Sequence, residues 1–225
     1  MKLKADFHIH TKEDKIDKVS YNAEELIDYA KKSGFDVLAI TNHNIITYSE
    51  DLKNYALEKD IVLIPGVEVK ANGKHIIILN ETSLSIDIKR PEDIYNIKRE
   101  NNLIVAPHPY FPAPHSLNRQ FEKYIDLFDA VEYTSFYINI MPFNRKAKKM
   151  AEMHNLPLIG NSDAHYIEQL GKTYTIVDAE KNADSIIKSI KEKKVELITK
   201  PLGFNMKDIK IAASFFRMYI NLFIR

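Results

Sequence analysis

Residues 3–10 read Leu3-Lys4-Ala5-Asp6-Phe7-His8-Ile9-His10, an apolar stretch that ends in two histidines separated by one residue. Short stretches rich in apolar residues are typical of β-strands. Because side chains alternate between the two faces of a strand, His8 and His10 share one face, with Asp6 below them. This stretch therefore predicts a strand that presents two imidazoles at its C-terminal end.

Similar apolar stretches recur along the chain and alternate with amphipathic ones. Strands are predicted at residues 3–10, 36–41, 61–70, 75–79, 103–108, 130–135, 158–161 and 173–177, and helices at 23–33, 49–59, 91–100, 117–124, 144–154 and 183–193. Ser49 is a suitable N-cap, and Pro91 suits a first helical position. Strands that alternate with helices indicate an α/β fold with a mostly parallel sheet. A compact βα-barrel is the leading prediction, and a doubly wound open sheet is the second.

One pair of strands is predicted to be antiparallel. Asn72-Gly73 separates two apolar stretches and is a strong signal for a two-residue hairpin loop. With that loop, Lys70 pairs with His75. Because residues two apart on a strand share a face, Glu68, Lys70 and His75 are expected to lie together.

The composition narrows the possible functions. The 225 residues suit one domain, and 32 Lys+Arg against 31 Asp+Glu give a net charge of +1. That balance argues against a large nucleic-acid surface but permits a small phosphorylated substrate. With no cysteine, disulfides and thiolate catalysis are excluded. Six glycines and no Gly-rich phosphate motif, beside eight histidines, point to histidine chemistry.

No targeting or membrane segment is expected. Residues 1–6 alternate apolar and charged side chains, and no window of eighteen apolar residues occurs. The sequence therefore predicts a cytoplasmic protein without a transmembrane segment.

Most of the histidines fall near the C-terminal ends of predicted strands, the end that carries the active site in αβ barrels. Each of these motifs taken alone is more often structural than functional. Their common position favours a metal site, because Zn, Mn and Fe accept imidazole and carboxylate together. The number of such groups suits two or three divalent ions. The groups are His8, His10, His43, Glu68, His108, Glu132, Asp163 and His165.

Taken in order, these motifs resemble the polymerase and histidinol phosphatase (PHP) family of metal-dependent phosphoesterases, in its short, free-standing branch. The motifs are Asp6-Phe7-His8-Ile9-His10-Thr11, Thr41-Asn42-His43-Asn44, Gly66-Val67-Glu68, His75, Ala106-Pro107-His108-Pro109 and Gly160-Asn161-Ser162-Asp163-Ala164-His165. The resemblance implies a distorted (β/α)7 TIM-like barrel of parallel strands, with up to three Mn, Fe or Zn ions at their C-terminal end. It implies metal ligation by His8, His10, His43, Glu68, His108, Asp163 and His165.

The chain departs from the family pattern in three places. Asn42 stands where the family usually has Asp, which removes a negative charge close to His43. The ligand that follows the first motif is either Asp17 or Asp14, and Asp17 is preferred. A family histidine in the sixth strand is replaced by Glu132, which is taken as a ligand.

The expected reaction is hydrolysis of a phosphate monoester or diester by a metal-activated hydroxide. His75 or a carboxylate of the metal site such as Asp163 would protonate the leaving group, and Lys70 and Arg145 are candidate substrate contacts. A nucleotide or short oligonucleotide is the favoured substrate, with Tyr110, Phe111, Phe136 and Tyr137 available to stack on a base or to pack a lid.

Three alternatives are weighed. A histidinol-phosphate-type phosphatase and a non-catalytic PHP-fold scaffold both share the barrel. Metal-dependent amidohydrolases also begin with His-x-His, but they typically continue with a bridging lysine on strand four, which this pattern lacks.

The remaining features lie toward the end of the chain. Residues 1–200 are predicted to form the barrel and residues 201–225 an apolar helix. That helix is expected to pack on the barrel or to join copies in a homo-oligomer, and a membrane-surface role is left open. His154 is interpreted as a structural residue at a helix end, and His115, in a Pro-rich loop, is left unassigned.

Overall fold

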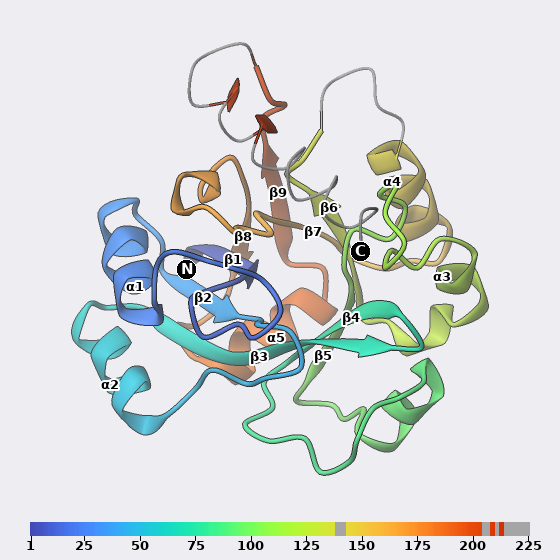
Figure 1. Cartoon of the computed structure of the whole chain (residues 1–225), viewed down its shortest axis with the longest axis horizontal. Coiled ribbons are helices and arrows are strands. Elements are labelled where there is room, and N and C mark those ends of the chain that lie inside the picture. The colour runs from blue at the N-terminus through green and yellow to red at the C-terminus, as the bar shows by residue number, and fades with distance from the viewer. Residues whose placement is uncertain (138–142, 204–207, 210–211, 214–225) are drawn as a thin grey trace.

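The computed structural model describes residues 1–137, 143–203, 208–209 and 212–213. Within these residues, nine strands form one sheet in the order β7-β6-β5-β4-β3-β2-β1-β8-β9. They are β1 (Lys2–Ile9), β2 (Val37–Ile40), β3 (Val62–Ala71), β4 (Lys74–Leu79), β5 (Leu103–Ala106), β6 (Ala130–Thr134), β7 (Leu158–Asn161), β8 (Thr173–Asp178) and β9 (Val195–Thr199). The sheet curls until its two edges meet (Figure 1). The α/β class is thereby confirmed, and the sheet is a nearly closed barrel.

Two strands, β4 and β8, run against their neighbours. β1, β2 and β3 are mutually parallel, as are β5, β6 and β7, whereas β4 is antiparallel to β3 and β5, and β8 to β1 and β9. The reversal at β4 follows from the Asn72-Gly73 loop, whose residues take positive φ angles of 49° and 76°. Lys70 pairs with His75 as predicted. The sheet is therefore mixed, whereas the resemblance implied seven parallel strands.

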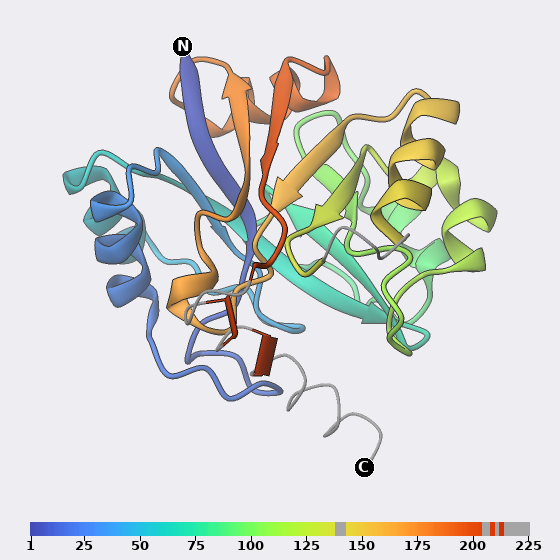
Figure 2. The ribbon, with the colours of Figure 1, turned by 90° about the horizontal axis from the view of Figure 1, so that it is seen from above.

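Side chains, instead of a ladder of backbone hydrogen bonds, close the seam between the two sheet edges. β7 contacts both β8 and β9 there, and Figure 2 shows β7 beside β9. The Thr175 hydroxyl on β8 donates to the Gly160 carbonyl on β7 and accepts from the Gly160 amide, both at 2.9 Å. Beyond the end of β7, the His10 amide donates to the Ala164 carbonyl at 3.0 Å, and an isolated bridge pairs Ile9 with Ala164.

Helices cover the barrel on both sides and at one end (Figure 1). The interior side chains of the strands pack with those of α5 (Ala183–Lys191). Outside the sheet, α1 (Ala23–Lys32) and α2 (Glu50–Glu58) cover β1 to β3. The other outer face is covered by η1 (Pro91–Asn96), α3 (Arg119–Lys123), η2 (Ile125–Leu127) and α4 (Phe143–Met153). A further 3₁₀ turn, η3 (Ile167–Gln169), follows β7.

Local side-chain chemistry explains where the helices begin and end. The Ser49 hydroxyl accepts from the Leu52 amide at 3.1 Å, so the predicted N-cap of α2 is confirmed. The helix predicted at 91–100 is a shorter 3₁₀ helix, because the Asn102 side chain accepts from the Arg99 amide and donates to the Ile97 carbonyl. The helix predicted at 117–124 is likewise reduced to α3.

One strand in the chain's second half was not predicted. This strand, β9, pairs with β8 over five residues. The predicted C-terminal helix, at residues 201–225, lies mostly outside the described residues. None of the helices in the part of the chain that the structure describes is long and apolar enough to span a bilayer.

Substituting Gly160→Ala tests the seam. A Cβ at this position would collide with Leu197 Cδ1 and lie 2.9 Å from Thr173 Cγ2 and 3.0 Å from the Tyr174 carbonyl oxygen. Overpacking of this kind costs about 1–3 kcal/mol, and denaturant unfolding should show a loss of that size. Gly73→Asn is the control, because Gly73 has open space and Asn tolerates its positive φ. Equal stability of both variants would contradict the tight seam.

Candidate metal centre

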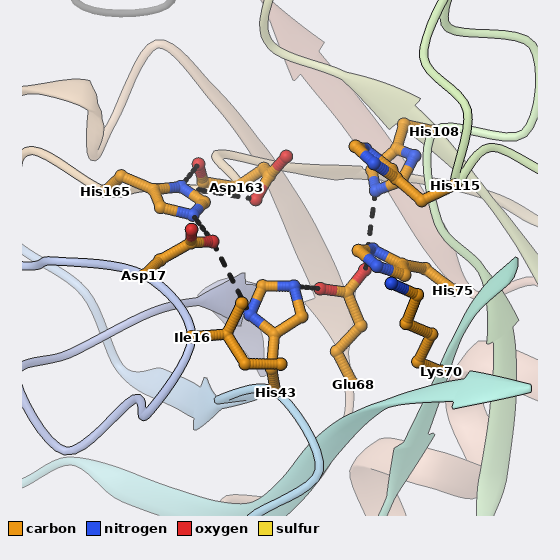
Figure 3. Close-up of a pocket in the computed structure, with 10 residues that line it drawn as sticks. All are labelled: Ile16, Asp17, His43, Glu68, Lys70, His75, His108, His115, Asp163 and His165. Carbon is orange, nitrogen blue, oxygen red and sulfur yellow. Dashed lines mark hydrogen bonds and ion pairs between the residues drawn. The ribbon is translucent and has the colours of Figure 1, made fainter. Parts of the chain in front are cut away.

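Ten residues from distant parts of the chain line one pocket at the end of the barrel (Figure 3). They are Ile16, Asp17, His43, Glu68, Lys70, His75, His108, His115, Asp163 and His165. Four of these side chains closely follow the ends of β2, β5 and β7, as the sequence predicted: His43, His108, Asp163 and His165. Glu68 and Lys70 lie within β3 itself. β4 contributes from its first residues, since it runs in the opposite direction.

His8 and His10 are fully buried and contact two of the carboxylates that line the pocket, Glu68 and Asp163. Their Nε2 atoms are 3.2 Å apart. Glu68 Oε2 lies 3.5 Å from both nitrogens, and Asp163 Oδ1 lies 3.3 Å from His8 and 3.4 Å from His10. Ligand atoms on one tetrahedral zinc ion lie about 3.4 Å apart. This spacing therefore fits four ligands of a common ion.

Two further carboxylates hold these imidazoles in position. Glu132 Oε2 accepts from His8 Nδ1 at 2.7 Å, and Asp14 Oδ2 accepts from the Nδ1 atoms of His10 and His43, each at 2.9 Å. A carboxylate on Nδ1 leaves Nε2 free to bind a metal, which is the usual arrangement around a metal-binding histidine.

The structure adds detail to the predicted carboxylate ligands. Glu132 was predicted to bind a metal. Its Oε2 contacts His8 and Asn161 and so orients His8, while its buried Oε1 has no hydrogen-bond partner in the described part of the chain, so its role as a ligand stays a prediction. Asp14 and Asp17 turn out to have different surroundings. Asp14 is buried against His10 and His43, whereas Asp17 lines the pocket and its Oδ2 lies 3.0 Å from His165 Nε2. Asp17 thus remains the candidate ligand.

A second group of imidazoles faces the other oxygen of Glu68. Glu68 Oε1 lies 3.0 Å from His75 Nδ1 and 3.4 Å from His108 Nε2. Although they are close, neither Oε1 nor His75 Nδ1 makes a hydrogen bond within the described part of the chain. Buried polar atoms without partners are rare, so this pair fits a site that is completed by a cation.

The electrostatics of the pocket fit the same interpretation. Burial alone would raise the pKa of Glu68, but its contacts with the imidazoles of His75, His8 and His43 hold it well below its usual range. Burial likewise works against a charged His43, yet Glu68 and Asp14 raise its pKa to about 10. Protons on the imidazoles therefore balance the carboxylates where metal ions would otherwise do so.

Two of the candidate ligands have an unusual backbone conformation. His108 and Asp163 have positive φ angles of 28° and 49°, which are unusual for side-chain-bearing residues. Strain of this kind persists where the surrounding structure enforces it, often at functional sites. The Ser116 hydroxyl, 3.3 Å from His108 Nδ1, further fixes the His108 ring.

Asn42, which stands in place of the usual Asp, has a structural role. Its Oδ1 accepts from the Thr11 amide, and its Nδ2 donates to the hydroxyls of Thr11 and Thr47, each at 2.8 Å. Its polar atoms are therefore paired with neutral groups, and it does not line the pocket. The negative charge that an Asp would carry at this position is therefore absent from the surroundings of the pocket and not from its lining.

Several other predicted residues do not reach the pocket. Arg145 is exposed on α4 and does not line it, so the predicted substrate contact has no support. His154 is exposed at the end of α4, where a structural role was predicted. Tyr110, Phe111 and Tyr137 are buried and pack against other aromatic rings, which favours the lid-packing interpretation. His115, left unassigned by the sequence, does line the pocket.

Comparisons with known proteins point in one direction. A family model described as PHP-associated matches residues 142–195. The uncharacterized protein MJ1587 of Methanocaldococcus jannaschii is 32% identical over 166 residues, 67% of this chain and 95% of that protein. Two solved structures share the fold: a putative metal-dependent phosphoesterase from Bifidobacterium adolescentis (TM-score 0.57, 15% identity, 72% of this chain and 87% of that one) and the lesion-specific endonuclease Q from Pyrococcus furiosus (TM-score 0.59, 19% identity, 88% and 58%).

Asp14→Asn tests whether Asp14 positions two ligands. The neutral amide keeps the size of the side chain but weakens its bonds to His10 and His43, so metal affinity should fall about 10–100-fold. Competition with a chromophoric chelator measures this. Asp87→Asn, at an exposed site, is the matched control. Unchanged affinity in Asp14→Asn would contradict the positioning role.

Metal binding should be coupled to proton release. Because the pKa of His43 is raised to about 10, metal-free protein carries a proton there at neutral pH that an ion must displace. Apparent Mn²⁺ affinity should therefore rise with pH from 6 to 9, by about tenfold per unit for each displaced proton. Calorimetry in buffers of different ionisation enthalpy counts these protons, and an affinity independent of pH would contradict the assignment.

Proposed function

Because the chain belongs to the PHP family of metal-dependent phosphoesterases, we propose that it hydrolyses phosphate esters at the centre built around Glu68. The observation that carries the proposal is the convergence of imidazoles on both oxygens of this one buried carboxylate. A scaffold protein has no need for such a costly arrangement of buried ionisable groups.

The residues fall into overlapping sets that suit two or three divalent ions. His8 and His10 with Glu68, His10 and Asp163 with His165, and His75 and His108 with His115 each bring ligand atoms within 4.8 Å of one another. Bound Mn²⁺, Fe²⁺ or Zn²⁺ would supply an activated water and offset the charge on the phosphoryl oxygens. Asp17 and His43, in contact with these sets, are further candidate ligands.

The environments of His75 and Asp163 support metal binding and not proton donation. Burial lowers the pKa of His75, so its ring is neutral near pH 7. Burial would raise the pKa of Asp163, but His8, His10 and His165 together hold it well below its usual range. A general acid must be protonated at the working pH, so neither group suits that role. We assign both to the metal centre, and the leaving oxygen would take its proton from solvent.

Lys70 is the best candidate for a substrate contact. It is exposed at the opening of the pocket, next to its hairpin partner His75 (Figure 3). Its amide donates to Asn44 Oδ1 at 2.9 Å, which fixes the backbone, and its side chain lines the pocket. Lys70 is the single Lys or Arg among the ten lining residues.

These features favour a small phosphorylated substrate, such as a nucleotide or a short oligonucleotide, over duplex DNA. Endonuclease Q shares the fold and acts on DNA, but this chain has a net charge of +1, and Lys70 is the single Lys or Arg among the described residues that line its pocket. Duplex binding normally relies on many Lys and Arg contacts to phosphates. Histidinol phosphate, a small monoester, is the second candidate.

The activity test uses aryl phosphate mono- and diesters with Mn²⁺, Fe²⁺ or Zn²⁺ added in turn to metal-free protein. Hydrolysis that depends on the added ion is expected. Lys70→Ala should raise KM by up to about fivefold, because one exposed ion contact is worth up to about 1 kcal/mol, while Arg145→Ala leaves it unchanged. No hydrolysis by folded, metal-loaded protein of any of these esters, a dinucleotide or histidinol phosphate would overturn the proposal.

A further inference from the structure

His115 lies on the Pro-rich loop after β5, against two candidate metal ligands. Its ring stacks on that of His75, with centroids 4.3 Å apart and planes 14° apart, and lies edge-on to His108 at 5.4 Å. One nitrogen from each of the three rings lies within 4.8 Å of the other two. Neither the family motifs nor the spacing of the sequence assigns a role to His115.

The three rings surround the side of Glu68 that lacks hydrogen bonds. Glu68 Oε1 and His75 Nδ1 are 3.0 Å apart, are both buried, and have no hydrogen-bond partner in the described residues. Buried polar atoms without partners are rare, so this pair fits a position that a cation completes. Glu68, His75 and His115 all line the same pocket (Figure 3).

The loop that carries His115 is tied to the β3–β4 hairpin by its backbone. The His75 amide donates to the His115 carbonyl at 3.0 Å. Lys74 Nζ donates to the carbonyls of Pro114 at 2.7 Å and Ser116 at 2.9 Å. The position of His115 is therefore built into the fold.

We infer that His115 completes a nitrogen-rich metal position with His75 and His108, in which Glu68 is shared with the neighbouring position at His8 and His10. Three imidazoles and one carboxylate suit Zn²⁺, whereas the neighbouring position, with two imidazoles and two carboxylates, also suits Mn²⁺. The inference rests on the proposed metal-dependent function. It predicts that the centre holds unlike ions, with zinc on the side of His115.

The test measures metal content and zinc affinity in wild-type protein, His115→Ala and His115→Gln, with His154→Ala as a control at an exposed histidine. Loss of a direct ligand should weaken one zinc equivalent at least about 100-fold, since even outer partners are worth 10–100-fold. Manganese bound at the remaining positions should be unaffected. The ratio of zinc to manganese affinity should therefore fall in both His115 variants and stay constant in the control.

The outcomes separate this inference from the proposed function. Full zinc content and affinity in either folded His115 variant would overturn the role of His115 and leave the phosphoesterase proposal intact, and a change in KM alone would do the same. Wild-type protein that binds no metal would overturn both. Ring-nitrogen NMR signals of ¹⁵N-histidine-labelled wild-type protein provide a readout that needs no variant: an unshifted His115 signal on zinc addition would also overturn the inference.

Discussion

The arrangement of the site depends on one buried carboxylate. Glu68 is 1% exposed, and the nitrogens of five histidines lie within 3.5 Å of its oxygens. An isolated carboxylate at this depth would cost several kcal/mol, so the surrounding positive charge is a condition for the fold. The backbone fixes its depth, because a Cβ on Gly66 would lie 2.9 Å from Thr41 Cγ2 and 3.2 Å from the Ile40 carbonyl oxygen. β3 can therefore press closely against β2 and carry Glu68 to the centre.

The net charge of the chain does not reveal that acidic side chains are concentrated around the site. A net charge of +1 coexists with six carboxylates gathered around or beneath the centre, at Asp6, Asp14, Asp17, Glu68, Glu132 and Asp163. Burial raises the pKa of Asp6 to about 7, although Ser162 and His8 donate hydrogen bonds to it. A region so rich in acidic groups is stable only with protons or cations among them. The site is thus selective for positive charge even though the surface as a whole is neutral.

The sequence predicted the parts of this structure that follow from regular periodicity. The strand carrying His8 and His10, the hairpin at Asn72-Gly73 and the position of Glu68 beside His75 all depend on alternation and turn chemistry, and the structure has them. Loop paths carry no such period. The path of residues 11–19 decides whether Asp14 or Asp17 faces the pocket. The path of residues 109–118 brings His115 against His75. The sequence correctly placed Glu132 in the strand that runs beside the site. It could not show that Glu132 contacts His8 through Nδ1, because that depends on the orientation of the imidazole ring. β9 was missed because it lies directly after α5 and is recognisable mainly by its pairing with β8.

The position of the metal centre next to the seam between the sheet edges suggests that bound ions would also stabilise the barrel. Thr175 and the contact of His10 with Ala164 join the edges by a few hydrogen bonds, where other neighbouring strands share a ladder. Asp163 and His165 follow β7 on one side of this line, whereas on the other side His8 lies in β1 and His10 directly follows it. Any ion held by both pairs would act as a clasp across the weakest line of the barrel, because a ligand that binds only the closed form adds its binding energy to closure. The ions proposed for catalysis would therefore also stabilise the closed barrel. Removing the metal would lower the free energy of unfolding as well as the activity.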